Sequence, residues 1–162
     1  MSQSLIRRLV SNDPALSEVL ALIQASFAFM TGRIDPPSSM TQLTLQDLNL
    51  KAQESWILVI GDPVMACVVA SPLPHLLYIG KIAVDPSLRG QGVARDLVSF
   101  CEKIAKNLGL DRLELQVRIE LIENQVAFTK LGFVKTAERS HPGYAQITEI
   151  TMQKILARTT LA

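Results

Sequence analysis

The feature that most constrains this chain is a glycine-rich turn between an apolar segment and an amphipathic one. Residues 82–95 read IAVDPSLRGQGVAR. Asp85-Pro86 ends the apolar segment, because proline lacks a backbone donor and restricts the residue before it. Gly90 and Gly92 then precede a stretch whose apolar residues recur at helical spacing. The sequence therefore predicts a strand, a tight turn and a helix in that order.

The start of that helix is a candidate anion site. A helix N-terminus presents unpaired amides and the positive end of the peptide dipole, and glycine lets a phosphate approach the backbone closely. Arg89 and Arg95 add positive charge. The spacing fits neither the nucleoside triphosphate loop nor the dinucleotide fingerprint. We predict a pyrophosphate site here, and a strand-to-helix connection without a ligand is the alternative.

Periodicity elsewhere predicts a mixed α/β protein with about seven strands and four helices. The strand at 76–84 is almost continuously apolar, which predicts burial on both of its faces. The hairpin at 56–70 predicts antiparallel pairing, and the later strand-helix-strand units predict parallel pairing. The strands are expected at 5–10, 56–60, 64–70, 76–84, 113–117, 133–136 and 147–155, and the helices at 14 to near 32, 43–52, 93–108 and 124–131.

Composition limits the class of protein. The chain has 162 residues, 48% hydrophobic and 19% charged, which predicts one globular domain over residues 1–162. A formal net charge of +1 gives no reason to expect nucleic acid or membrane as a partner. Cys67 and Cys101 lie in apolar segments and form neither a disulfide framework nor a metal-binding pattern. Without a signal sequence at residues 1–20, a cytoplasmic location is expected.

The motifs resemble those of a known family. Val84-Asp85-Pro86 followed by residues 89–94 resembles the acyl-CoA pyrophosphate loop of the GNAT superfamily of N-acetyltransferases, whose motif is Arg/Gln-x-x-Gly-x-Gly/Ala. Glu123-Asn124 and Leu131-Gly132-Phe133 resemble the family's next helix. The resemblance is strong over residues 76–133 and weak before residue 56. It implies a GNAT-like fold, with acetyl-CoA lying where two central strands splay apart.

The resemblance also implies which residues contact acetyl-CoA. Ile82, Ala83 and Val84 would present their strand backbone to the pantetheine arm. Asn124 and Phe128 would approach from the other side of the gap, and Asn124 could also cap its helix. The residues implied around the pyrophosphate are Arg89, Gly90, Gln91, Gly92, Val93, Ala94 and Arg95.

The proton donor departs from the family pattern. Attack of an amine on a thioester needs a neutral amine, a donor for the developing oxyanion and a proton for the leaving thiolate. The family's usual tyrosine falls at Phe128, which has no hydroxyl. Tyr78 and Tyr144 are the candidates to replace it, and departure as a free thiolate is the alternative.

Glu114 is the candidate base, because it is a carboxylate on a predicted central strand. A solvated charge or an ion pair with a neighbouring arginine is the alternative. The acceptor pocket is expected between the first helix, the 33–40 loop and the 140–146 turn. We expect an N-acetyltransferase acting on a small-molecule or peptide amine, with a non-catalytic acyl-CoA sensor as the alternative. Exposed sheet edges also suggest a homodimer.

Overall fold

The computed structural model describes residues 5–157, and its strands and helices follow each other in the order predicted from the sequence. The strands are β1 (Ile6–Leu9), β2 (Trp56–Ile60), β3 (Ala66–Pro72), β4 (Leu77–Val84), β5 (Arg112–Arg118), β6 (Val134–Arg139) and β7 (Glu149–Ile155). The helices are α1 (Leu16–Ala28), α2 (Leu45–Glu54), α3 (Val93–Asn107) and α4 (Ile122–Lys130), with 3₁₀ turns η1 (Ser39–Gln42) and η2 (Pro86–Leu88).

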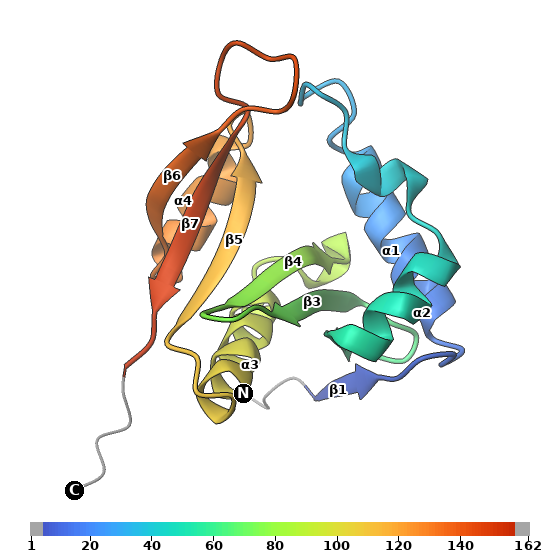
Figure 1. Cartoon of the computed structure of the whole chain (residues 1–162). Coiled ribbons are helices and arrows are strands. Elements are labelled where there is room, and N and C mark those ends of the chain that lie inside the picture. The colour runs from blue at the N-terminus through green and yellow to red at the C-terminus, as the bar shows by residue number, and fades with distance from the viewer. Residues whose placement is uncertain (1–4, 158–162) are drawn as a thin grey trace, which may run out of the picture.

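The strands form one mixed sheet with the order β1-β2-β3-β4-β5-β7-β6. Strands β4 and β5 run parallel, whereas the other neighbouring strands pair antiparallel. The parallel pair stands at the centre, and in Figure 1 the two halves of the sheet diverge from it. The predicted α/β class and the mixed sheet are confirmed.

Helices cover both faces of the sheet. Helices α1 and α2 pack on the first four strands through a cluster that includes Leu16, Val19 and Leu48. Helix α3 packs on the opposite face, where the apolar stripe predicted for it is buried. Residues of α4 and the turns around it join this second cluster, which extends across both halves of the sheet. The sheet thus holds the two halves as one framework (Figure 1).

A bulge in β4 changes which side chains the strand buries. Cys67 pairs with Ala83 and Val69 with Gly80, so β4 has one extra residue there, and Lys81 takes a φ of 51°. The bulge reverses the alternation: Leu77 and Ile79 pack toward α3, whereas Ala83 packs toward α1. The expectation that β4 is buried on both faces is wrong, because several of its residues are only half-buried along an opening.

Two boundaries near α4 also differ from the prediction. Helix α4 begins at Ile122 with Leu121 at the N-cap position, so Asn124 lies inside the first turn and does not cap it. Leu121 is buried, and its amide donates to the carbonyl of Arg118, which starts the turn before Asn124 is reached. Phe133 is fully buried immediately before β6. Among the described residues, no helix is long and apolar enough to cross a membrane.

Candidate functional site

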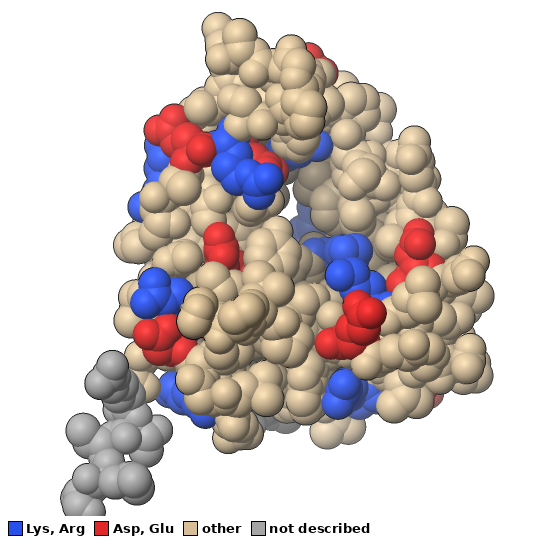
Figure 2. Space-filling view, viewed as in Figure 1, with Lys and Arg blue, Asp and Glu red and all other residues tan. Residues whose placement is uncertain are grey.

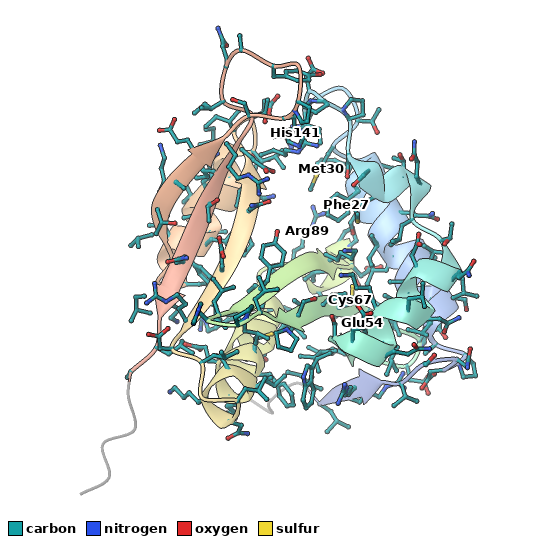
Figure 3. All side chains as sticks on the ribbon, viewed as in Figure 1. Phe27, Met30, Glu54, Cys67, Arg89 and His141 are labelled. Carbon is teal, nitrogen blue, oxygen red and sulfur yellow. The ribbon has the colours of Figure 1, made fainter. Side chains whose placement is uncertain are left out.

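The two central strands separate almost as soon as they meet. Within residues 5–157, β4 and β5 pair at Leu77 with Leu113 and at Tyr78 with Glu114, and no further ladder pair joins them. A cavity of about 170 Å³ opens beyond these pairs, between the strands. Phe27 of α1 and Met30, just after that helix, line it, and Figure 3 shows both side chains on the α1 side of the opening. The edge of β4 that faces β5 is therefore free to pair with an extended ligand.

A second cavity, of about 330 Å³, continues from the first toward the start of α3. Ile82, Ala83 and Val84 line it from β4, and Asn124 lines both cavities from α4. No protein hydrogen bond engages the Asn124 side chain in the described part of the chain. Phe128 lines the first cavity, where its ring packs edge-on against Phe133 at 5.8 Å. The structure thus brings these sequence-predicted residues together around one passage.

The glycine turn beside the passage leaves open space. Gly90 and Gly92 have φ values of 77° and 78°, a conformation that only glycine adopts without strain. A Cβ built on either residue meets no atom within 4 Å. Asp85 braces the turn, because its Oδ1 accepts from the Ser87 amide at 3.0 Å. The turn is fixed in shape and empty on its outer side.

Several amides at the start of α3 have no protein acceptor. Helix α3 has no side-chain cap. Over the residues that the structure describes, the amides of Gly90, Gly92, Ala94 and Arg95 donate to no protein group. The Arg89 amide does not share this property, because it donates to the Pro86 carbonyl at 3.3 Å. The Arg89 amide is thus used by η2, and the side chain of Arg89 is the part of this residue left for a ligand.

Side chains of the turn have separate roles. The Arg89 side chain lies on the second cavity, with its guanidinium carbon 5.9 Å from the centre of the Phe29 ring (Figure 3). Gln91 donates to the Ser87 carbonyl at 3.2 Å and so braces the turn. Val93 is buried in the core, which leaves only its backbone for a ligand. Neither Arg89 nor Arg95 forms a salt bridge within the described residues, so both cations are available to an anion.

Tyr78 stands at the point where the strands part. Its ring lies against Gly80, which lines the first cavity; the Cε1 atom is 3.4 Å from the position a Gly80 Cβ would take. Burial raises the pKa of Tyr78, and the carboxylates of Glu149 and Glu114 raise it further, while Arg139 opposes them. The phenol therefore stays protonated over the ordinary pH range and can donate a hydrogen bond.

A polar cluster faces the first cavity from β5, β6 and β7. The Gln116 amide is oriented so that its nitrogen donates a hydrogen bond to Glu149 Oε1 at 3.2 Å. Its oxygen accepts a hydrogen bond from Arg139. Arg139 Nε also lies 3.8 Å from Glu149 Oε1. Both Gln116 and Glu149 line the cavity, and the Glu149 side chain is 13% exposed. One oxygen of this carboxylate is thus held in place by its neighbours.

A segment between α1 and η1 closes the passage from above. We call residues 33–37 the strap. Arg33 pairs with Glu123 at 2.5 Å, and the Asp35 amide donates to Glu120 Oε2 at 3.0 Å. Tyr144, in the β6–β7 loop, donates its hydroxyl to Asp35 Oδ1 at 2.6 Å, which raises the pKa of that phenol. Figure 1 shows the two loops meeting over the gap, and Figure 2 shows the molecule hollowed beneath them.

The family comparison agrees with this geometry. The model of the acetyltransferase (GNAT) family matches residues 19–133. This chain belongs to the GNAT acetyltransferase family. Members of the family use acyl-CoA, which is consistent with the free β4 edge and the unpartnered amides of α3. No curated protein sequence matches this GNAT chain at a significant level.

Solved structures of other acetyltransferases share its fold. An acetyltransferase from Streptococcus agalactiae has a TM-score of 0.74 at 13% identity, covering 96% of this chain and 100% of its own. A GNAT family acetyltransferase from Elizabethkingia anophelis with acetyl-CoA bound has a TM-score of 0.71 at 16% identity, with 96% and 100% covered. The ribosomal-protein-S18-alanine N-acetyltransferase from Escherichia coli has a TM-score of 0.69 at 18% identity, covering 97% of this chain and 96% of its own. The predicted GNAT-like fold is confirmed.

The structure separates the candidate catalytic residues of this GNAT chain. Tyr78 and Glu114 lie side by side where β4 and β5 part, whereas Tyr144 lies in the β6–β7 loop and is bonded to the strap. None of the three lines either cavity described above. Sequence reasoning missed Glu149 and Gln116. Glu149 is an isolated acid between β-branched residues in a predicted strand, and that pattern is the signal that could have indicated it.

Proposed function

We propose that this chain catalyses transfer of an acetyl group from acetyl-CoA to an amine, with residues 1–162 acting as one domain. One observation carries the proposal: the parallel strands at the centre of the sheet part after two pairs, and the gap leads to a helix start whose amides have no protein acceptor. An extended ligand ending in a pyrophosphate fits both features.

The residues present fit the pantetheine and pyrophosphate parts of acetyl-CoA. Ile82, Ala83 and Val84 would hold the pantetheine arm by their backbone, with Asn124 and Phe128 on the opposite wall. The free amides of the glycine turn would bind the pyrophosphate, and Arg89 and Arg95 would balance its charge. The open space around Gly90 and Gly92 lets phosphate oxygens approach those amides. When bound, the thioester supplies an activated acyl group.

The chain's own residues would position the reactants and transfer protons. The Tyr78 hydroxyl is held protonated beside the gap, so we assign it the proton donor role that Phe128 cannot fill. Glu114, next to Tyr78 in the adjoining strand, would accept a proton from the amine through a water. We also assign the Tyr144 hydroxyl to positioning the strap, because its bond to Asp35 ties the β6–β7 loop to that segment. Much of the rate would come from alignment of the two reactants, an effect that reaches about 7 to 11 kcal/mol in well-oriented cases.

Two measurements test the proposal and its alternative. Acetyl-CoA at about a hundredfold over its dissociation constant is expected to stabilise the chain by ~2.7 kcal/mol, which a thermal melt resolves. Thiol release with at least one member of an amine panel is expected from an enzyme. A melt shift without thiol release from any amine supports the non-catalytic sensor instead. That alternative is favoured by Phe128, which stands where the family usually has a tyrosine. No melt shift refutes both functions.

A further inference from the structure

Three charged side chains line the first cavity, and the two cations among them have no acidic partner. Lys81 lines the cavity from β4, Arg118 from the end of β5 and Glu149 from β7. Glu149 is paired with Arg139, as described above. Within residues 5–157, neither Lys81 nor Arg118 forms a salt bridge. The cavity wall therefore has positive charge that the described protein groups do not neutralise.

The bulge in β4 brings Lys81 to this wall. Cys67 pairs with Ala83 and Val69 with Gly80, so Lys81 and its neighbour together stand opposite a single residue of β3. The φ of 51° at Lys81 is uncommon for a residue that has a side chain. Bulges re-aim a side chain and are frequent beside functional sites, and strained backbone is found there too. The chain thus keeps a costly backbone conformation at the position of a cavity-lining cation.

The other charges near Lys81 do not neutralise it. Burial lowers the pKa of Lys81, and Lys51 of α2 lowers it further, while Asp47 of α2 raises it. The Asp47 carboxylate forms no salt bridge with Lys81, and its Oδ2 accepts from the Thr44 amide at 2.9 Å in the capping box of α2. A half-buried ammonium group without an ionic partner has lost part of its hydration. An anion bound beside Lys81 would offset that loss.

Arg118 adds positive charge from the β5 side of the cavity. Its Nη1 donates to the Pro36 carbonyl at 2.7 Å and its Nη2 to the Pro37 carbonyl at 3.4 Å. Both acceptors are uncharged, so the strap holds the guanidinium in place without neutralising it. In Figure 2, Lys and Arg side chains border the hollow beneath the two loops. A ligand in the cavity is therefore exposed to cations from both strands.

This charge distribution favours a negative group on the acceptor. Because Glu149 shares the wall, a single negative charge meets less repulsion than the double charge of a phosphate. A carboxylate has one charge and two oxygens that accept from an ammonium group. We propose that the acceptor is an amine that also carries a carboxylate, and that Lys81 binds this carboxylate. The inference rests on the proposed acetyltransferase function and names its acceptor class.

The first test compares acids with their amides on the unaltered protein. The acceptors are glycine, L-leucine, L-phenylalanine, β-alanine and 4-aminobutyrate, each beside its primary carboxamide. For the pair with the highest turnover, we expect kcat/KM to be at least about tenfold higher for the acid, measured by thiol release from acetyl-CoA. The amine of a carboxamide is less basic, so basicity alone would favour the amide. Equal values or a preference for the amide overturn the proposal, and a preference for O-phosphoethanolamine over β-alanine overturns the choice of carboxylate.

The second test removes the charge at the bulge. Lys81→Met is expected to bring the acid-to-amide ratio of kcat/KM to within about threefold of one, with the acetyl-CoA melt shift unchanged. The matched control is Lys51→Met, which removes the same charge from a residue that acts on Lys81 but does not line the cavity, and it is expected to keep the ratio. Lys81→Arg keeps the charge and is expected to retain most of the preference. A preference that survives in Lys81→Met overturns the assignment of Lys81.

The two tests separate failure of the acceptor class from failure of the function. Thiol release with amines that lack a carboxylate, but not with the amino acids, overturns the acceptor class and leaves the acetyltransferase function standing. A lack of thiol release with every amine of either kind refutes the function itself. If Lys81→Met does not fold, Lys81→Gln takes its place with the same expected ratio. The comparison of acids with amides decides the acceptor class in any case, because it uses the unaltered chain.

Discussion

Gly92 and Gly109 flank the two ends of α3 in nearly the same backbone conformation, with φ values of 78° and 74°. A Cβ on either residue meets no atom within 4 Å. Gly92→Glu and Gly109→Glu therefore add the same side chain, the same charge and the same backbone strain. They differ in whether the change falls at the proposed pyrophosphate site, and in the helix dipole, which favours a carboxylate at Gly92 and disfavours one at Gly109.

The magnitude follows from the conformation. An L-residue in the left-handed region costs roughly 1 to 2 kcal/mol. For a domain of this size, each kcal/mol lowers Tm by about 2 to 4 °C, so both variants are expected to melt about 2 to 8 °C lower. Neither is expected to lose more, because no atom obstructs the new side chain.

The response to acetyl-CoA separates the two variants. At about a hundredfold over the dissociation constant, binding adds ~2.7 kcal/mol, which raises Tm by about 5 to 11 °C. We expect that rise in the unaltered protein and in Gly109→Glu. In Gly92→Glu the new carboxylate lies where the phosphates would be, so we expect no rise. Differential scanning calorimetry with and without acetyl-CoA measures the rise in Tm. An equal rise in both variants refutes the assignment of the glycine turn to the pyrophosphate.

Three further predictions concern the chemistry and the assay. Tyr78→Phe is expected to lower kcat by about 10²-fold or more, with KM for acetyl-CoA unchanged, because a positioned proton donor contributes that much. Product assays at fixed times measure kcat, and an unchanged kcat excludes the donor role. Added to Tyr78→Phe, Phe128→Tyr is expected to restore part of the lost kcat, since a hydroxyl returns to the cavity wall. A double variant with the same kcat as Tyr78→Phe contradicts this. Burial raises the pKa of Cys67 and Cys101 to about 12, so neither thiol is expected to react with a colorimetric thiol reagent until the protein is unfolded, and rapid labelling of the native chain counts against it.

The boundaries that sequence reasoning missed have local physical causes. The pattern around Asn124 indicated a helix cap, yet Leu121 is buried and turns the chain three residues earlier. The apolar run of β4 indicated burial on both faces, but it contains no sign of the extra residue near Lys81 that bulges the strand. A bulge depends on the register with β3, and register is a property of two segments far apart in sequence.

The sequence by itself determined the order of the elements, the mixed sheet and the glycine turn at the start of α3. Those features follow from local chemistry: apolar spacing, the conformational freedom of Gly90 and Gly92, and the missing donor of Pro86. Only the tertiary structure decided that Lys81 and Arg118 line one cavity, and that Tyr144 and Arg33 close the passage through the strap. These contacts join residues up to 109 positions apart, and which partner a charged side chain meets depends on how the sheet folds.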